Sequence, residues 1–423
     1  MEKFDAIVVG AGPAGSACAY SLASSGLQVL MLERGKYPGS KNVFGGRIYP
    51  YPLKELIPDY EKDVPIERNV VKEGITFMTE KSAASITFAS TQSSSFTAIR
   101  SKFDRWLADK AVEKGAMLFP ETKVDELIIE GNMAKGVKTG QDDVLADVVV
   151  DCEGSTATLA KKAGLRSNIN PKHVSIGIKD VIELPQNTIE ERFGLSGNEG
   201  FAGVYVGYAS SWLRGGAFIY TNKDSVSVGV VVKVVDLVEA KVEVSSIFEN
   251  FKQHAAIMKL LKGGKTLEYS AHTIPEAGLA MVPKLYRGGF LVCGDAAGFI
   301  INNGYTFRGV DLAISSGMAA ADTVKRAKQR NNFDESSLSY YRKALEKRKV
   351  LPDMRTFSKG PKYMENRRLY TAYPKLICEI LEGMYGIRGG GTKIVRKIAT
   401  EKAKSNVSMF ALIKDMLAGA NAM

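Results

Sequence analysis

The fold is decided by the stretch Phe4-Asp-Ala-Ile-Val-Val-Gly-Ala-Gly-Pro-Ala-Gly15, near the start of the 423-residue chain. Residues 5–9 form a short apolar, β-branched run, long enough for one buried parallel strand. The glycines that follow have the spacing G-x-G-x-x-G, and a run of small residues over 13–25 predicts a helix directly after them. Strand, glycines and helix in this order predict a loop that binds the phosphates of a dinucleotide.

Each glycine of this loop has a separate physical task. Gly10 permits the tight turn, Gly12 leaves no Cβ between the backbone and a pyrophosphate, and Gly15 lets the helix pack close to the strand. Pro13 and Ala14 open the helix, whose free N–H groups and positive dipole end face the phosphates. A glycine turn without a ligand is the alternative, and the surrounding strand and helix signals argue against it.

A carboxylate stands where a dinucleotide site requires one. A second apolar run over residues 28–32 ends at Glu33, 18 residues beyond Gly15, and a carboxylate there can accept both hydroxyls of a ribose. This pattern fits NAD or FAD. A later segment, Gly289-Phe-Leu-Val-Cys-Gly-Asp-Ala-Ala-Gly298, repeats the order of apolar strand, glycine and acidic residue. A second loop at the same sheet edge can reach the ribityl chain through Asp295, and NAD has no ribityl chain, so FAD is favoured.

Because this pattern recurs late in the sequence, we expect an α/β protein whose first domain is discontinuous. We expect a Rossmann-like FAD-binding domain over 1–165, with inserted strands at about 70–99, completed by 276–332. Alternating, turn-separated runs predict an antiparallel-sheet substrate domain over 166–275. Within it, residues 244–262 read as one helix. A basic helical region over 333–423 closes the chain, with a helix beginning at Asp334, a break at Pro352 and an amphipathic helix at 373–384.

Composition and cysteine usage exclude several classes of protein. Hydrophobic residues make up 45% and charged residues 24% of the chain, which is ordinary for a folded protein. The four cysteines lie far apart in apolar settings with no C-x-x-C, so no metal site and no iron–sulfur cluster is expected. The first strand leaves no room for a signal peptide, and no apolar run approaches the roughly 20 residues that span a bilayer. We therefore expect a cytoplasmic protein, or one peripheral to the inner face of the cell membrane.

The positive charge is concentrated near the C-terminus. The net charge is +11, and residues 341–406 hold seventeen Lys and Arg against six Asp and Glu, so this block accounts for the whole excess. An anionic membrane surface or an acidic protein partner could use it, and so could solvent alone. Nucleic acid is not favoured, because no basic–aromatic reading module accompanies the charge.

Together these motifs resemble a known class of flavoproteins. The loop with Glu33-Arg34, Arg100 ahead of an F-D-x-W-L helix, and Gly294-Asp295 resemble the p-hydroxybenzoate-hydroxylase-type fold. Within that class, Lys41-Asn-Val-Phe-Gly-Gly-Arg47, the segment 216–223 and Gly304-Tyr-Thr-Phe-Arg-Gly309 resemble the FixC branch of the electron transfer flavoprotein–quinone oxidoreductases. The resemblance runs from the N-terminus to about Val324.

The resemblance implies FAD as prosthetic group, electrons arriving from an electron transfer flavoprotein, and delivery to a membrane quinone. It also implies which residues contact FAD. The residues at the ADP part are Gly10, Gly12, Pro13, Ala14, Gly15, Glu33, Arg34 and Val124, and those at the phosphate and ribityl region are Arg100, Gly154, Gly294 and Asp295. The residues beside the flavin ring are Gly45, Gly46 and Arg47, and Gly309 and Val310 form the helix N-terminus that faces it. Glu153-Gly154 departs from the Asp-Gly usual in the class, so the contact there is less secure.

One departure bears on the partners. Full-length quinone oxidoreductases of this family carry four cluster cysteines in a C-terminal ferredoxin-like segment, and here only Cys378 lies beyond Gly298. The resemblance therefore implies a separate FixX-type ferredoxin subunit. No side chain is identified as catalytic. His173, His254 and His272 have no ligand-like spacing and are expected to be structural. Tyr305 and Arg308 are candidates for lining a quinone pocket, or for bracing their own loop.

Three other functions remain open at this stage. A geranylgeranyl reductase shares the broad-class motifs, although the middle sheet lacks a compact Y-x-W-x-F-P element. A non-catalytic FAD-bearing assembly subunit, or one that anchors a complex to the membrane, would carry the same cofactor motifs. An aromatic hydroxylase is a weaker candidate, because oxygen chemistry leaves no specific residue signature here.

Overall fold

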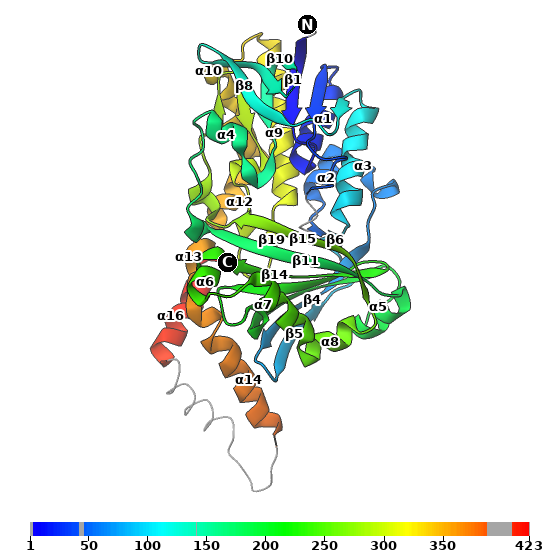
Figure 1. Cartoon of the computed structure of the whole chain (residues 1–423), viewed down its shortest axis with the longest axis vertical. Helices are drawn as coiled ribbons and strands as arrows, with labels where there is room; N and C mark the ends of the chain where they lie inside the picture. Colours follow the sequence, from blue (N-terminus) through cyan, green and yellow to red (C-terminus); the bar gives the residue numbers. More distant parts are fainter. Residues whose placement is uncertain (1–2, 42–45, 141, 387–407, 423) are drawn as a thin grey trace.

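A computed structural model describes residues 3–41, 46–140, 142–386 and 408–422. Two sheets stand one above the other, and a group of C-terminal helices flanks and extends below the second sheet (Figure 1). The predicted fold class, a Rossmann-type α/β domain with a second sheet and C-terminal helices, is confirmed.

The first sheet has eight strands around the N-terminal strand. The parallel strands are β1 (Lys3–Val9), β2 (Val29–Leu32), β7 (Met117–Phe119), β10 (Asp143–Asp151) and β17 (Phe290–Val292). The antiparallel strands β8 (Val124–Glu130), β9 (Met133–Thr139) and β16 (Tyr286–Arg287) complete it. The pairing of β17 with β10 closes the sheet with a strand from late in the chain.

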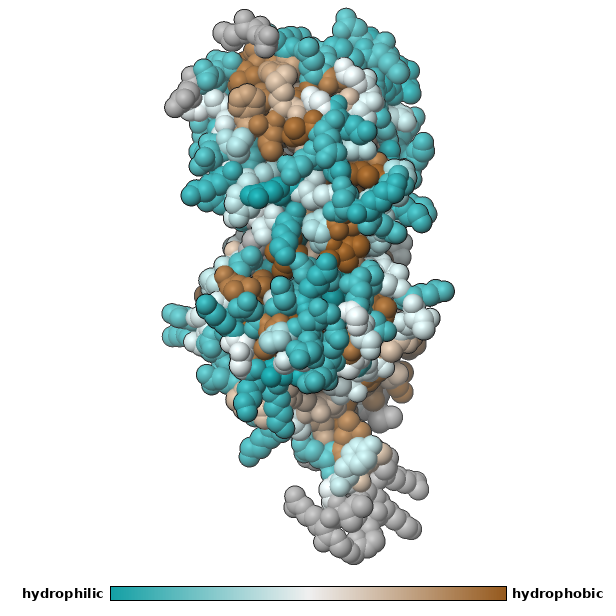
Figure 2. All heavy atoms as spheres, turned by 90° about the vertical axis from the view of Figure 1, so that its right-hand side faces the viewer, coloured by the Kyte–Doolittle hydropathy of each residue, from teal (hydrophilic) through white to brown (hydrophobic). Residues whose placement is uncertain are grey.

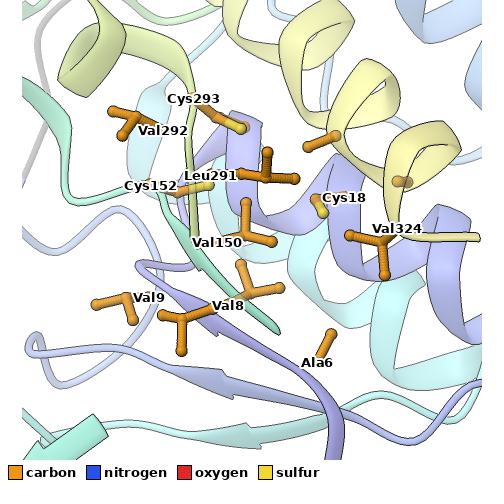
Figure 3. Close-up of a cluster of buried hydrophobic side chains, with 14 of the residues drawn as sticks. Ala6, Val8, Val9, Cys18, Val150, Cys152, Leu291, Val292, Cys293 and Val324 are labelled. Carbon is orange, nitrogen blue, oxygen red and sulfur yellow. The ribbon is translucent and has the colours of Figure 1, made fainter. Parts of the chain in front are cut away.

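Four helices pack against this sheet or against one another, and the side chains at their contacts are small or apolar. They are α1 (Pro13–Ala23), α3 (Arg100–Glu113), α4 (Thr158–Lys162) and α9 (Val310–Gln329). A Cβ on Gly317 of α9 would lie 2.1 Å from the Ala14 carbonyl oxygen of α1, so only glycine permits this approach. Figure 3 shows the core beneath them, where Cys18, Cys152 and Cys293 lie among valines and Leu291. All four cysteines are buried and free.

The second sheet has nine strands. They are β3 (Arg47–Ile48), β4 (Arg68–Met78), β5 (Ala83–Ala89), β6 (Phe96–Thr97), β11 (Val174–Glu183), β12 (Glu199–Gly207), β13 (Gly215–Thr221), β14 (Ser225–Lys233) and β15 (Lys265–Pro275). The strands expected at about 70–99 belong to this sheet. The strands within 166–275 pair with one another antiparallel, as predicted. Outside that range, β4 pairs with β12 in parallel. These two strands come from separate parts of the chain, so no hairpin sets their direction.

Short helices pack beside the second sheet, and one prediction fails there. They are α5 (Gln186–Phe193), α6 (Val234–Ala240), α7 (Val244–Gln253) and α8 (Ala255–Leu261). Helix α2 (Tyr51–Leu56) packs against α9 instead. The single helix expected over 244–262 is two helices, because His254 has extended backbone angles and its Nδ1 accepts a hydrogen bond from the Ala256 N–H. His254 therefore caps α8.

The C-terminal region is helical as predicted. Its described helices are α10 (Glu335–Leu338), α11 (Tyr340–Lys347), α12 (Val350–Thr356), α13 (Gly360–Tyr363), α14 (Ala372–Tyr385) and α16 (Met409–Ala420). Pro352 does not break a helix: it lies in the first turn of α12, where its missing N–H costs nothing. The chain turns instead at Lys349, whose φ is +61°. In the described part of the chain no helix has the length and apolarity needed to cross a membrane.

Candidate functional site

The loop after β1 forms the floor of a large cavity. Gly10 has a φ of +98°, and a Cβ there would lie 2.4 Å from the Cys152 carbonyl oxygen. A Cβ on Gly15 would lie 1.9 Å from the Gly10 carbonyl oxygen, whereas a Cβ on Gly12 would meet no protein atom within 4 Å. Gly12 also precedes the first residue of α1, Pro13. Gly10 and Gly15 are thus required by packing, and the space beside Gly12 opens into the cavity.

Glu33 ties this loop to the next strand. Its Oε2 accepts a hydrogen bond from the Ala11 N–H at 3.0 Å, and its Oε1 accepts one from the Gly35 N–H at 2.7 Å. Glu33, Arg34 and Val124 all line the cavity; Glu33 and Val124 are buried, whereas Arg34 is exposed. The carboxylate is therefore oriented by backbone donors at the cavity wall.

A buried ion pair lies further along the wall. Arg100 donates through Nε to Asp104 Oδ1 and through Nη2 to Asp104 Oδ2, both at 2.8 Å. Burial raises the pKa of Asp104, and the Arg100 guanidinium opposes that rise. Burial also raises the pKa of Asp295, against the charges of Arg100 and Arg166. Asp104 was not found from the sequence, although its i, i+4 spacing from Arg100 on a helix is a signal for such a pair.

Two glycine turns complete this part of the cavity. Gly154 and Gly294 have φ angles of +77° and +58°, and both line it. Arg166, which sequence reasoning missed, donates through Nη1 to the carbonyl oxygens of Asp295, at 3.0 Å, and Ala296. This bond holds the turn that begins at Gly294.

The cavity measures about 780 Å³ and extends from the first sheet to the C-terminal helices. A volume of this size suits a large cofactor or ligand. One end is the polar cradle of glycines, Glu33, Arg100 and Asp295. This cradle, with open space at Gly12 and a helix N-terminus behind it, fits the pyrophosphate and ribose of FAD.

Gly309 and Val310 reach the cavity where α9 begins. On the opposite wall, the Arg47 guanidinium donates to Glu73 Oε1 at 2.7 Å and to Ser95 Oγ at 2.9 Å. It also lies 4.9 Å from the centre of the Tyr49 ring. Gly46 is buried beside Arg47 but does not line the cavity. Gly45 lies outside the described residues.

The two quinone-pocket candidates lie in different places. Tyr305 is 40% exposed and lines the cavity. Arg308 does not line it: its Nη2 donates to Asp311 and to Asp353, both at 2.7 Å. Two carboxylates hold the Arg308 guanidinium, so this side chain joins its loop to α9 and α12. Arg308 thus braces the loop, which was the second of the two roles predicted for it.

The far end of the cavity is apolar. One wall is the second sheet and the other is formed by the C-terminal helices. Its apolar lining residues are Ile75, Phe77, Val204, Phe218, Leu376, Ile377, Leu412 and Met416. None of these was identified as a lining residue from the sequence, because the helices that carry half of them are distant in the chain.

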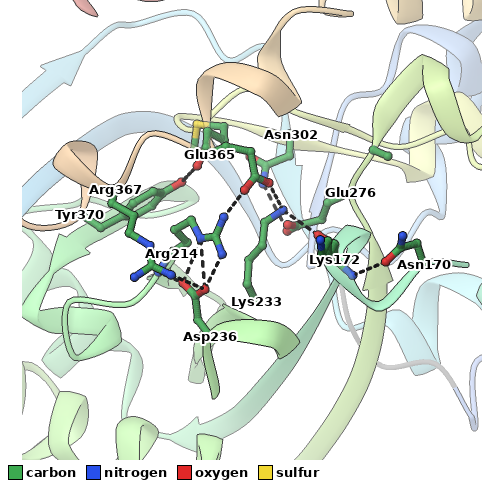
Figure 4. Close-up of polar contacts among 12 residues, drawn as sticks. Asn170, Lys172, Arg214, Lys233, Asp236, Glu276, Asn302, Glu365, Arg367 and Tyr370 are labelled. Carbon is green, nitrogen blue, oxygen red and sulfur yellow. Dashed lines mark hydrogen bonds and ion pairs between the residues drawn. The ribbon is translucent and has the colours of Figure 1, made fainter. Parts of the chain in front are cut away.

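Polar residues lie between the two ends. Arg214, Lys233, Glu276 and Asn302 line the cavity and lie close together (Figure 4). His272 lines it as well, and its Nε2 lies 3.4 Å from Ser155 Oγ. Burial and the charges of Arg100 and Arg34 lower the pKa of His272. In the described residues no group of His, Cys, Asp and Glu could hold a metal ion.

Comparison with known proteins identifies the family. Residues 5–180 match the model described as FAD dependent oxidoreductase, and residues 174–274 match the ubiquinone-binding model of ETF-QO. Residues 360–423 match the model described as ETF-QO/FixC family C-terminal domain. The chain is 44% identical to the probable electron transfer flavoprotein-quinone oxidoreductase YdiS of Escherichia coli (strain K12), over 100% of this chain and 99% of that protein.

The chain belongs to the FixC and electron transfer flavoprotein–quinone oxidoreductase family. It is also 38% identical to Protein FixC of Rhizobium meliloti (strain 1021), over 100% of this chain and 99% of that protein. The resemblance drawn from the sequence is thereby confirmed, and so is FAD as the cofactor of an oxidoreductase. The ubiquinone-binding model covers β11, β12, β13, β14 and most of β15 of the second sheet, whereas β3–β6 lie within the FAD-dependent oxidoreductase match. Helices α13, α14 and α16 lie in the family C-terminal domain.

Solved structures show how widely the fold is used. The chain is similar to a geranylgeranyl bacteriochlorophyll reductase-like protein from Thermoplasma acidophilum, with a TM-score of 0.73 and 20% identity over 99% of this chain and 100% of that one. It is also similar to the flavin-dependent brominase Bmp2, with a TM-score of 0.63 and 15% identity over 100% of this chain and 95% of that one. These likenesses concern the fold alone.

Proposed function

We propose that this FAD-dependent oxidoreductase passes electrons from an electron transfer flavoprotein, through a separate FixX-type ferredoxin subunit, to a membrane quinone. The observation that carries the proposal is the apolar end of the cavity, which is lined by β4, by β12 and β13 of the ubiquinone-binding match, and by the C-terminal helices. An apolar slot that continues from a cofactor cradle suits a ring with an isoprenoid tail.

The proposed contacts to the cofactor follow the wall of the cavity. Gly12, Ala14 and Glu33 would hold the ADP part, with Glu33 accepting the ribose hydroxyls. Arg100 and Asp295 would serve the phosphate and ribityl region, and Gly309 and Val310 would present a helix N-terminus to the flavin ring. Gly15 supports the loop from behind, because its Cβ position is filled by backbone. FAD, when bound, supplies one- and two-electron transfer.

The separate ferredoxin is proposed because the four cysteines of this sequence are not grouped to bind a cluster. Three of them are buried in the core of the first sheet, and Cys378 is buried on α14. On the proposed route, the ferredoxin subunit would supply the four-cysteine cluster.

The membrane surface is proposed as the docking site of α14 and α16. Tyr385, Phe410 and Leu417 are 80%, 79% and 62% exposed, near the apolar end of the cavity. In Figure 2, brown hydrophobic surface lies low on the face shown, at the height of α14 in Figure 1. Exposed aromatic and aliphatic side chains beside a basic segment are typical of helices that lie on an anionic bilayer.

The test is isolation of the tagged chain from cells that produce it naturally. We expect electron transfer flavoprotein subunits and a small ferredoxin to co-purify, and the assembly to reduce a short-chain quinone. If the chain instead purifies alone and, once reduced, saturates prenyl double bonds, it is a geranylgeranyl reductase. If flavin in the intact assembly is neither reduced by the donor nor reoxidised by quinone, the chain is a non-catalytic subunit.

A further inference from the structure

A row of three ionisable side chains runs from the protein surface to the middle of the cavity. It consists of Glu365, Lys233 and Glu276, which come from three separate parts of the fold (Figure 4). Glu276 follows β15, Lys233 is the last residue of β14, and Glu365 lies just beyond α13. Lys233 and Glu276 line the cavity, whereas Glu365 lies behind it.

The outer side chain of this row, Glu365, is in contact with water. The Glu365 side chain is 40% exposed, and the Lys233 side chain is 8% exposed. Lys233 Nζ donates a hydrogen bond to Glu365 Oε1, and another to the Lys172 carbonyl oxygen at 3.2 Å. Arg214 donates to the second oxygen of Glu365 and fixes its orientation. A proton taken up by Glu365 from water is therefore one hydrogen bond away from Lys233.

The inner carboxyl group binds its proton more tightly than an exposed glutamate does. Burial raises the pKa of Glu276, while Ser175, Lys233 and Asn302 oppose that rise and the charge of Glu365 adds to it. Asn302 Nδ2 donates to Glu276 Oε1 at 3.4 Å. The Tyr370 phenol is the remaining titratable group beside Glu276, and burial raises its pKa, so it stays protonated. A carboxyl group of this kind can release a proton and regain it from a neighbouring ammonium.

We propose that Glu276 donates protons to the acceptor bound in the cavity and is reprotonated through Lys233 from Glu365. This inference rests on the proposed function, since a quinone becomes a quinol only with two electrons and two protons, Q + 2e⁻ + 2H⁺ → QH₂. The electrons come from the reduced cofactor. For each proton, the O–H bond of Glu276 breaks and an O–H bond forms on a quinone oxygen. Lys233 Nζ makes its hydrogen bonds to Glu365 and to the Lys172 carbonyl oxygen, so it returns a proton to the Glu276 carboxylate through an intervening water. It is reprotonated from solvent through Glu365, and two passes supply both protons.

The rival interpretation is that these ion pairs only brace the second sheet against the C-terminal region. Arg214 and Asp236 do brace it: Arg214 donates to Asp236 through its backbone N–H at 2.9 Å and through Nε at 3.0 Å. Glu276 differs, because it makes no ion pair at hydrogen-bond distance among the described residues and it faces the cavity. A brace does not need a neutral carboxyl group on the wall of a ligand cavity.

The experiment compares the holoprotein with Glu276→Gln, Lys233→Met and a control, Glu243→Gln, which changes an exposed carboxylate just before α7. Each protein is reduced with dithionite without oxygen and mixed with a short-chain ubiquinone, and flavin reoxidation is followed by absorbance. Infrared spectra of the oxidised holoproteins report the carbonyl stretch of a protonated carboxylic acid. Quinone affinity and bound flavin are measured in parallel, so that loss of folding or binding is recognised.

We expect Glu276→Gln to keep its flavin and quinone affinity, to lose one carboxylic-acid band, and to slow reoxidation by about a hundredfold or more. Lys233→Met should slow it as well, with partial rescue by small diffusible acids, and Glu243→Gln should match the wild type. Wild-type rates and an unchanged carboxylic-acid band in Glu276→Gln would overturn the relay and leave the proposed function standing. Reduced wild-type protein that no quinone reoxidises would overturn both.

Discussion

Arg100 and Asp104 form a two-bonded ion pair at the wall of the cofactor cavity, with both N–O distances at 2.8 Å and both side chains at most 5% exposed. The pair places a fixed positive charge beside Asp295. It also means that Arg100 depends on a partner one turn along its own helix.

Replacing Asp104 should therefore affect both stability and cofactor binding. Asp104→Ala leaves the Arg100 charge buried without this carboxylate, at a cost of about 3 kcal/mol in the free energy of unfolding. The double variant Arg100→Met, Asp104→Leu should regain most of the stability but bind FAD more weakly. Urea unfolding and FAD titration of the apoprotein measure the two effects. Equal FAD affinity in the double variant and the wild type would show that Arg100 makes no contribution to cofactor binding.

The nucleotide loop offers a matched pair of glycine substitutions. Gly12→Val places its side chain in open cavity space, so we expect a folded protein without flavin. Gly15→Ala places a methyl group 1.9 Å from the Gly10 carbonyl oxygen, so we expect a loss of folded protein at any FAD concentration. Circular dichroism and the flavin absorbance of the purified proteins distinguish these outcomes. A yellow Gly12→Val protein would refute the placement of the pyrophosphate.

The helices α14 and α16 allow a test of the membrane surface. The double variant Phe410→Glu, Leu417→Glu should abolish flotation with anionic liposomes, because it puts charge on two exposed apolar side chains of α16. Ile129→Glu is the matched control, since it changes an exposed apolar side chain on β8, at the opposite end of the molecule (Figure 1). Equal flotation of all three proteins would contradict the proposed surface.

Asp151 should make stability depend on pH. It is fully buried, and burial together with the charge of Glu153 raises its pKa to about 8. The folded protein therefore keeps this proton up to about pH 8, whereas the unfolded chain releases it near pH 4. The wild type loses stability over that window, by up to about 1.4 kcal/mol per pH unit, and no further above it.

Asp151→Asn removes this titration and keeps a neutral side chain. The free energy of unfolding of Asp151→Asn, relative to the wild type, should rise between pH 5 and about pH 8 and then level off. The slope is the diagnostic quantity, because the amide also loses one of the two acceptors that Asp151 offers to the N–H groups of Glu153 and Ala160. A difference that stays constant with pH would mean that Asp151 is ionised in the folded protein.

Much of the nucleotide end could be predicted because its signals are local. The loop at Gly10–Gly15, the acid at Glu33 and the strand before Asp295 can each be recognised from a pattern of a few residues. Helix α1 begins at Pro13, where the run of small residues predicts it, for the same reason.

The apolar end of the cavity and the polar residues beside it could not be predicted, because they come from segments that are distant in the sequence. Glu276, Lys233 and Glu365 lie in unremarkable sequence, and only the fold brings them together. The two failed helix predictions have a similar origin: the Nδ1 cap of His254 and the left-handed turn at Lys349 are single-residue features that helical periodicity does not register.

The most direct test of the central claim is a single turnover without oxygen. The reduced holoprotein is mixed with a short-chain ubiquinone in one arm and with a geranylgeranyl lipid in the other, while flavin absorbance and products are recorded. We predict rapid reoxidation by the quinone with one quinol formed per flavin, and no saturated lipid. Reoxidation by the lipid with loss of a double bond, and none by quinone, would contradict the account.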